Sequence, residues 1–505
     1  GVQYTGAWGE KDAVKLNGSY FFNNTNTRNK SLLQKWYETP SPDDYLIQEG
    51  ESETLNYNHR ANVRLDWNIN KNHSANVRFS TTKNKYSSNP SSSVNPLNPN
   101  PYNRNNYGRT SQYAIYFESS RYFQEQNFTS FAAEWNSRYL DGRLTNTLRG
   151  TYSKQYEPRS FVGDNFPTVD ILQELEDGTK AVLTSFGPDP FTYGNLRDVS
   201  TVVITDEISY TTGKHNIIAG LQFEHNNTKN GFMQGGLGYY VYNSWEDFKN
   251  AANGGDVTPL AFAITHSNRD DLKQVFPSFK YIQYSAYVQD EISFSNRFKL
   301  SAGLRFELPT YPNIEGNNNK KFEEMYKNYG GFKTSDMPNA RLNVAPRVGF
   351  NWDIAGDRKY VLRGGTGIFT GRIPFVWIVS VAGNSNCLQA QYIATHDKIA
   401  EGMDTPGFHQ NVNDILTDLY GGTFKATDDL AAPSGATILD KNLKMQGAWK
   451  STLALDMKLP GDIKVSLEGI YNMDMNTVMC KYLGMEEVAG GVTLPGEPAA
   501  RKKWA

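Results

Sequence analysis

The chain has 505 residues, and its 51 basic side chains nearly balance its 53 acidic ones. The chain therefore lacks the excess of positive charge with which proteins bind nucleic acid, and no nucleic-acid partner is expected. The longest apolar run, residues 373–383, is about half of the roughly 20 residues that a membrane-spanning helix needs, which excludes helical spans. Spanning strands stay compatible with the composition, because a tilted strand of about 9–11 residues needs only one apolar face.

Apolar and polar side chains alternate along much of the chain. The stretch 298–307 shows this clearly, with Leu300 and Leu304 on one face and Lys299 and Arg305 on the other. A period of two residues predicts a strand with one apolar and one wet face. The alternation predicts about fourteen strands in seven hairpins, which pair residues 1–8 with 13–22, 61–69 with 75–80, 127–140 with 143–152, 200–210 with 216–224, 281–292 with 298–307, 344–354 with 360–370, and 451–458 with 463–471.

Two kinds of connection join these strands. Short turns of roughly two to five residues, such as Asp141-Gly142, close the hairpins. Long polar segments separate the hairpins, and we expect loops at 23–56, 86–108, 226–279, 372–447 and 473–505, with a short helix near 244–252. Loops above about 15 residues are uncommon in compact domains. Their restriction to one side predicts an all-β fold, an antiparallel transmembrane β-barrel with short periplasmic turns and long extracellular loops.

Soluble β architectures fit this pattern less well. A sandwich would place long loops at both ends, and a propeller would repeat four strands every 40–50 residues or so. On a soluble sheet the charged strand face would be an ordinary solvated face, whereas in a wide barrel it would line the lumen. The barrel reading predicts that the faces bearing Leu65 and Trp67, Leu300 and Leu304, and Phe350 and Trp352 all point outward in one belt.

No catalytic or metal-binding pattern stands out, so no enzyme activity, cofactor or metal is expected. The seven histidines do not show metal-ligand spacing. The glycine-rich run 364–371 lacks the Lys-Ser/Thr of a phosphate-binding loop, and we interpret it as a strand approached closely by another backbone. Cys387 and Cys480 are too few for a disulfide framework. Two free thiols and a single bridge between them both remain open.

The long loops are rich in aromatic residues, which suit two interpretations. They could form a surface on which a ligand stacks, or they could pack the loops against one another and anchor them at an interface. The residues concerned are Tyr239, Tyr240, Tyr242, Trp245, Phe375 and Trp377.

Several motifs resemble one membrane-protein family. The run Tyr-Ser-Ala-Tyr-Val-Gln-Asp-Glu (284–291), followed by Leu-Ser-Ala-Gly-Leu-Arg-Phe-Glu (300–307), resembles the mid-barrel signature of TonB-dependent outer-membrane receptors. Residues 344–353 look like the next hairpin of that family. Residues 363–377 and 451–471 are similar to the Oar-like receptors of the Bacteroidetes.

The resemblance implies a 22-stranded barrel with an N-terminal plug and an energy-coupling box. Because this sequence shows fourteen strands and neither plug nor coupling box, we expect residues 1–505 to be a partial barrel domain without plug, signal peptide and C-terminal strands. The implied partners are the TonB energy-coupling complex, acting through the plug, outer-membrane lipid, a surface lipoprotein, and a small or polymeric ligand that the sequence does not identify.

The expected function is ligand capture by extracellular loops and energised import through the barrel. For ligand contact we single out Trp245, Arg372 and Trp377. For the lumen, where charges would hold the plug, we single out Arg305, Arg347, Arg363 and Glu468. Two alternatives remain: a structural or adhesive outer-membrane barrel without transport, and a secreted soluble β-rich glycan-binding protein.

Overall fold

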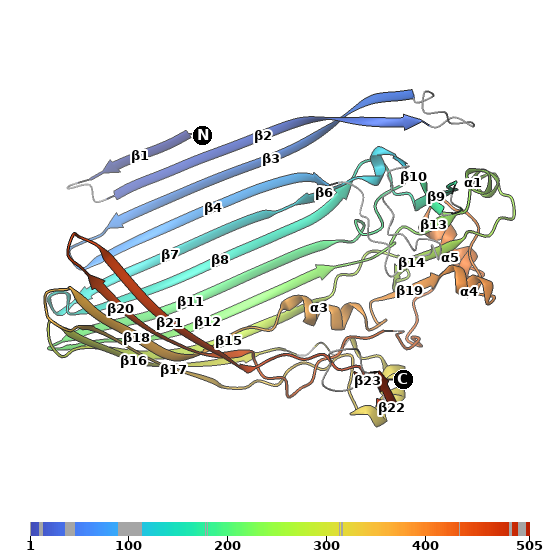
Figure 1. The fold of residues 1–505 in the computed structure, drawn as a ribbon. Helices are drawn as coiled ribbons and strands as arrows, with labels where there is room; N and C mark the ends of the chain where they lie inside the picture. The colour runs from blue at the N-terminus through green and yellow to red at the C-terminus, as the bar shows by residue number, and fades with distance from the viewer. Residues whose placement is uncertain are drawn as a thin grey trace.

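The computed structural model shows one large curved sheet with a cluster of smaller elements at one end (Figure 1). It describes residues 2–9, 14–35, 46–88, 114–176, 178, 180–312, 314, 317–433, 435–483, 487–492 and 501–504.

The large sheet is antiparallel and contains fifteen strands. Two of them, β6 and β7, occupy one position between β4 and β8 and are separated by Gln126, so the sheet has fourteen positions, as predicted. In chain order the strands are β1 Val2–Trp8, β2 Val14–Lys35, β3 Leu46–Asn68, β4 His73–Ser88, β6 Tyr122–Glu125, β7 Asn127–Tyr139, β8 Leu144–Phe161, β11 Leu196–Thr212, β12 His215–Gly231, β15 Ser278–Ser293, β16 Phe298–Thr310, β17 Asn343–Asp353, β18 Tyr360–Thr370, β20 Gly447–Lys458 and β21 Lys464–Asn476.

Several predicted loops are shorter than expected. The predicted loop 23–56 is wrong over most of its length, because β2 runs to Lys35 and β3 begins at Leu46, and the two strands pair throughout. The polar composition of this stretch hid the strands, since backbone pairing does not require alternating side chains. The segment after residue 473 is not wholly loop either, because β22 Glu487–Val492 pairs with β23 Arg501–Trp504. In the predicted loop 86–108, β4 extends to Ser88, and the remainder lies outside the described residues.

Cross-strand register carries one apolar face across the sheet. Partners followed from Trp67 through seven ladders lead to Phe306, which shares its face with Leu300 and Leu304. The next ladder pairs Leu300 with Phe350. The predicted single belt of apolar faces is therefore confirmed.

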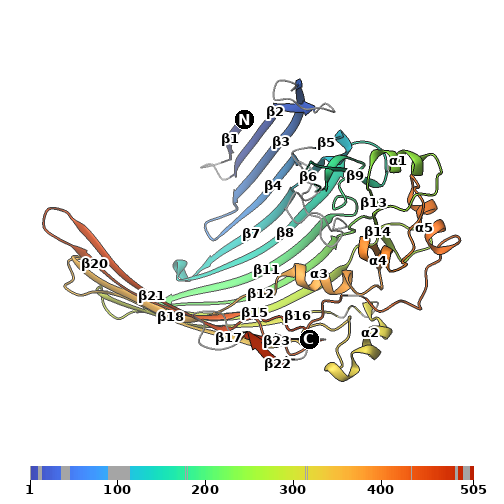
Figure 2. The same cartoon turned by 45° about the vertical axis from the view of Figure 1, so that its right-hand side comes forward.

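The opposite, polar face lies on the inside of the curve. Helix α3, Phe375–Gly383, packs on this face: the Phe375 ring centroid lies 5.2 Å from that of Phe279 and 5.4 Å from that of Tyr281. Figure 2 shows α3 inside the arc of the sheet. We call this polar surface the concave face. The apolar belt consequently lies on the convex face.

The long loops build a second, six-stranded sheet at one end of the large one (Figure 1). Its strand order is β19-β14-β13-β9-β10-β5. The bounds are β5 Ile115–Tyr116, β9 Thr168–Glu174, β10 Lys180–Phe186, β13 Tyr239–Tyr242, β14 Ala261–Ser267 and β19 Gln389–Ala394. Loops far apart in sequence thus share one sheet. We call this sheet with its covering helices the loop module.

Short helices accompany these strands. The predicted helix near 244–252 is confirmed as α1, Trp245–Ala252, in which the Ser244 hydroxyl accepts a hydrogen bond from the Asp247 N–H at 3.1 Å. The remaining helices are α2 Lys320–Met325, α4 His396–Ala400, α5 Val412–Tyr420, and the 3₁₀ helices η2 Glu118–Ser120, η3 Leu140–Gly142 and η5 Lys327–Tyr329. Within the described residues, no helix has both the length and the hydropathy of a membrane span.

The loop module has a hydrophobic core of its own. Tyr240 and Tyr242 are fully buried beside Phe262, and Ile415 and Leu416 of α5 pack against them. Tyr239 is buried on the other side of the same sheet. For these three tyrosines the stacking-surface interpretation is wrong, and the loop-packing interpretation is confirmed.

The glycine-rich run lies in β18, as interpreted from the sequence. A Cβ atom on Gly364 would come within 2.8 Å of the Thr452 carbonyl oxygen. The glycines therefore permit close approach of neighbouring strands and form no phosphate loop.

One pair of substitutions tests the assignment of the two faces. Val288 lies on the convex face between Leu304 and Ala219, and its neighbour Gln289 lies on the concave face. We expect Val288→Arg to lower the free energy of unfolding in lipid vesicles by about 2–4 kcal/mol, the cost of an arginine against hydrocarbon near the bilayer midplane. Gln289→Arg is the matched control and should change it by much less. Equal losses for the two variants would contradict the assignment.

Candidate functional site

The concave face brings the four predicted lumen residues to one surface. Arg347 lies opposite Gly303 in the ladder and therefore shares a face with Arg305. Arg363 lies opposite Asn351, which is on the same face as Arg347. Ala454 links Arg363 to Glu468 through two further ladders. All four side chains thus belong to the concave face.

Arg305 is the centre of a polar network on four strands. Its Nε donates to Glu307 Oε1 at 2.7 Å, and a terminal nitrogen donates to Gln222 Oε1 at 2.8 Å. Its guanidinium lies 5.4 Å from the ring centroid of Tyr287, whose hydroxyl donates to Glu207 Oε2 at 2.6 Å. The network connects β11, β12, β15 and β16.

A second group of charges lies near the C-terminal edge of the sheet. Arg363 Nε donates to Asp456 Oδ2 at 2.8 Å, and a terminal nitrogen lies 3.8 Å from Glu468 Oε1. Arg347 instead lies over the Phe369 ring, 4.5 Å from its centroid. Sequence reasoning missed Asp456 as a partner, although its place in the polar alternation of β20 was a usable signal.

A third cluster joins β4, β7 and β8 on the same face. Glu134 accepts from Arg149 Nε at 2.7 Å and from Asn76 at 3.2 Å, and Arg78 lies 3.4 Å away. Asn76 is buried, but the two arginines are about half exposed, and exposed ion pairs contribute only about 0–1 kcal/mol each. The clusters therefore matter less for stability than for presenting ordered charge to whatever fills the concave side.

Arg372, predicted as a ligand contact, interacts with two residues of the concave face. It forms an ion pair with Glu224, whose side chain is 9% exposed, and its guanidinium lies 5.0 Å from the Tyr281 ring centroid. The Tyr281 hydroxyl donates to Gln283, which donates in turn to Ser285 at 3.1 Å. Sequence reasoning missed Glu224.

The two predicted tryptophans lie in different parts of the structure. Trp377 is in α3, on the segment that begins with Arg372, and is 36% exposed. Trp245 is the first residue of α1 in the loop module, is 43% exposed, and packs against Phe248 at 5.8 Å between ring centroids. The structure thus places Arg372 and Trp377 on one segment and Trp245 on another.

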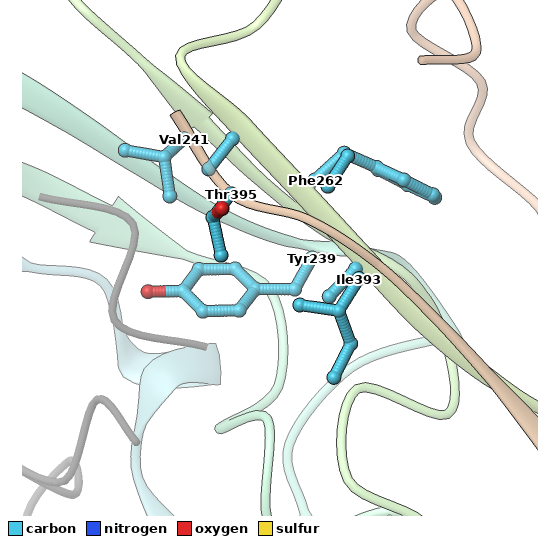
Figure 3. A pocket seen from close by; sticks show the side chains of 8 residues that line it. Tyr239, Val241, Phe262, Ile393 and Thr395 are labelled. Carbon is cyan, nitrogen blue, oxygen red and sulfur yellow. The ribbon is translucent and has the colours of Figure 1, made fainter. Parts of the chain in front are cut away.

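Cavities in the loop module differ greatly in size. The space beside Tyr239, Ile393 and Thr395 measures about 10 Å³, which fits at most a water molecule (Figure 3). A larger cavity of about 250 Å³ is lined by residues of three of the long loops that join strands of the large sheet, including Phe166, Met233 and His266.

The described residues contain no group of three or more metal-binding side chains. Cys387 and Cys480 are both free thiols, so the bridge that the sequence left open is not formed in this structure.

His266 is a buried titratable group in the loop module. Its Nδ1 lies 3.1 Å from the Ser267 carbonyl oxygen, which can only accept, so Nδ1 carries the proton and Nε2 accepts from the Tyr420 hydroxyl at 2.9 Å. Burial lowers the pKa of His266 below its ordinary value. The folded module therefore holds this imidazole neutral.

A family model described as an outer membrane beta barrel domain matches residues 14–476. None of the curated proteins matches the chain.

One solved structure shares the fold, and a second is similar at a lower score. The outer membrane transporter YddB from Escherichia coli aligns with a TM-score of 0.54 and 11% identity, over 93% of this chain and 45% of its own. A mutant of the ferric enterobactin receptor from Pseudomonas aeruginosa aligns with a TM-score of 0.46 and 9% identity, over 99% of this chain and 54% of its own. The chain spans about half the length of these structures.

The buried Glu224 carboxylate should depend on Arg372. We expect Arg372→Met to lower the free energy of unfolding in detergent by about 2 kcal/mol, because it leaves Glu224 charged and unpaired; the loss stays below that of a fully buried pair because Arg372 is half exposed. The double variant Arg372→Met, Glu224→Gln should recover most of this loss. Additive losses in the double-mutant cycle would contradict a direct interaction.

The loop module should weaken in acid. The unfolded chain binds a proton at His266 near pH 6.5, whereas the folded module binds it only at lower pH, so stability falls as the pH drops below about 6.5, by up to about 1.4 kcal/mol per pH unit. Hydrogen exchange of β14 between pH 7.5 and 5.5 measures this. His266→Gln should flatten the dependence, and an unchanged slope would show that another group is responsible.

Proposed function

We propose that this chain, which belongs to the outer membrane beta barrel domain family, forms part of the wall of a TonB-dependent transporter of the Oar-like group in Bacteroidetes. Family membership places the chain in the outer membrane, the predicted localisation, and excludes the secreted soluble alternative. The convex apolar belt then faces lipid.

The observation that carries the proposal is the charged concave face of a wide wall. Fourteen strand positions already exceed the eight at which a barrel's own side chains fill its interior. Arg305, Arg363 and their acidic partners line this interior instead of apolar residues. Such a lumen needs water or a separate folded plug to fill it.

In the proposed mechanism, the loop module captures the ligand and the concave face holds the plug. Trp245 and Trp377 supply exposed aromatic surface for ligand contact, and Arg372 connects the loops to the wall. Arg305, Arg347, Arg363 and Glu468 would exchange their present partners for groups on the plug. Residues 1–505 would then be a partial barrel domain, and the TonB complex would act on the plug.

Further partners follow from the same arrangement. Outer-membrane lipid contacts the convex belt, and a surface lipoprotein would dock on the loops from outside. The ligand is a small or polymeric nutrient. Catalysis forms no part of the proposed mechanism.

A structural or adhesive barrel is the second candidate. The loop module supports this candidate, because a six-stranded sheet with its own hydrophobic core offers a rigid surface for contact with an external partner. The two functions differ in their need for energy.

Uptake should require both the gene and inner-membrane energy. We expect deletion to abolish growth on one scarce nutrient among ferric siderophores, cobalamin, oligosaccharides and peptides. A protonophore should stop uptake of that nutrient and leave its surface binding intact, because energy acts after capture. Loss of cell adhesion without any nutrient phenotype would instead support the structural alternative.

Variants of the lumen arginines test whether the concave face holds the plug. Arg347→Gln combined with Arg363→Gln should reduce uptake but not surface binding, since both residues would act on the plug. Lys214→Gln, in an exposed hairpin turn, is the control and should leave uptake unchanged.

A further inference from the structure

One charged side chain interrupts the apolar belt of the convex face. Asp206 lies on the path of ladder partners that joins Trp67 to Phe306, with Leu148 opposite it on β8 and Leu221 opposite it on β12. Ile204 and Ile208 flank it on the same face of β11, and the side chain is exposed there. A carboxylate that faces hydrocarbon is costly, and an ionisable residue at such a position is by default a candidate functional site.

Asn146 satisfies only one oxygen of this carboxylate. Its Nδ2 donates to Asp206 Oδ1 at 2.6 Å and to the Glu207 carbonyl oxygen at 3.2 Å, so the amide is used on both sides. Among the residues that the structure describes, none donates to Asp206 Oδ2 and none forms an ion pair with Asp206. The amide is uncharged, and the negative charge therefore stays without a cation.

Other charges of the convex face are already matched or distant. Asp290, opposite Ile217 on the same face, has Oδ2 at 2.6 Å from His215 Nδ1. Lys154 and Lys280 both lie level with Ser200, near the end of β11 that enters the loop module. Lys154 also forms an ion pair with Asp198 at 2.6 Å. Asp206 is thus a carboxylate in the belt that its own face does not neutralise.

An apolar groove of about 440 Å³ begins at Asp206 and crosses the neighbouring strands. Ala286 forms its floor, because this small side chain lies between Leu221 and Phe306, its partners on either side. Among the lining residues that register places on the convex face, Asp206 and Tyr284 are the two with polar side-chain groups. The volume lies within the range of about 300–1,000 Å³ that small-molecule sites commonly have. We call this feature the lateral groove.

Charge complementarity decides which molecule fits the lateral groove. A lipid acyl chain fills the apolar part but brings no donor to Asp206. A second copy of this chain would present the same belt, in which the lysines lie toward the loop module. An ammonium group on an apolar chain satisfies both parts, and opposite charges attract strongly where no water screens them.

We propose that the lateral groove binds a lipid-soluble amine, an apolar chain that ends in a primary ammonium group. The ammonium donates to Asp206 Oδ2, and the chain lies across Leu221, Ala286 and Phe306. The groove opens to the bilayer and lies apart from the loop module. The proposal therefore rests on the lipid-facing orientation of the convex face and is independent of the proposed transport.

Native mass spectrometry of the intact protein, released from a neutral detergent, tests the proposal with three probes of equal chain length: dodecylamine, dodecan-1-ol and dodecanoic acid. We expect the protein to retain dodecylamine, to bind the alcohol about tenfold more weakly and to bind no acid, because the amine alone supplies a charge-assisted hydrogen bond. No retained amine, or equal retention of the three probes, would overturn the proposal. A complex of two chains that forms without the amine and excludes it would assign the surface to a second copy instead.

Two carboxylate variants locate the ammonium. Asp206→Asn keeps the shape of the side chain and should lower the affinity for dodecylamine by about tenfold or more, without loss of thermal stability, because it removes a charge from hydrocarbon. Asp290→Asn is the matched control: it changes a carboxylate on the same face, outside the groove, and should leave the affinity within about twofold. Equal affinity for Asp206→Asn and the wild type contradicts the proposal.

A substitution that fills the groove locates the apolar chain. Ala286→Leu adds carbon on the lipid-facing side and should lower the affinity for dodecylamine by about tenfold while the protein stays folded. Ala302→Leu, on the same face of β16 and outside the groove, should have no such effect. Unchanged binding in Ala286→Leu would place the chain elsewhere and overturn the proposal. A protein that binds the amine but imports nothing would contradict the transport function and leave the groove assignment standing.

Discussion

The interaction on which this structure depends is the hydrogen-bond ladder between neighbouring strands. In lipid no water is present to satisfy backbone N–H and C=O groups, so each strand must find partners in the strands beside it. A slip of one residue in any ladder would exchange the two faces of a strand. The ladders from β1 to β18 show no register shift. Val288 and Gln289 therefore share their two opposite faces with their partners on the neighbouring strands. Within the described residues, β1 and β21 form the two edges of the sheet.

This constraint explains how well the wall could be predicted. On strands such as β16, one side meets lipid and the other a wet interior, so Leu304 and Arg305 alternate and the sequence shows the fold directly. The loop module has no such contrast. Tyr239, Tyr240, Val241 and Tyr242 are all buried, because β13 is covered on both faces. A strand without alternation resembles any aromatic cluster, and its parallel partner β9 lies in another loop.

The candidate site was predictable in part for a related reason. Period-two alternation predicts which face a charge occupies, and it placed Arg305, Arg347, Arg363 and Glu468 on a single face. It does not predict partners across strands. Arg363 and Asp456 are 93 residues apart, and Arg372 and Glu224 are 148 apart, so only the completed sheet brings them together.

Sharing one sheet orders the loops and also couples their movements. A long free loop moves independently of its neighbours, whereas in the loop module a displacement of β14 must also move β13 and β19, which pair with it on either side. One continuous segment leaves the wall, crosses the concave face and enters this module: β18 ends at Thr370, Arg372 pairs with Glu224, α3 packs on Tyr281, and β19 begins at Gln389. The contacts that hold the loops together and those that order the wall therefore meet at Arg372. This stretch is one of several connections between the two sheets, together with those from β8 to β9, β10 to β11, β12 to β13 and β14 to β15.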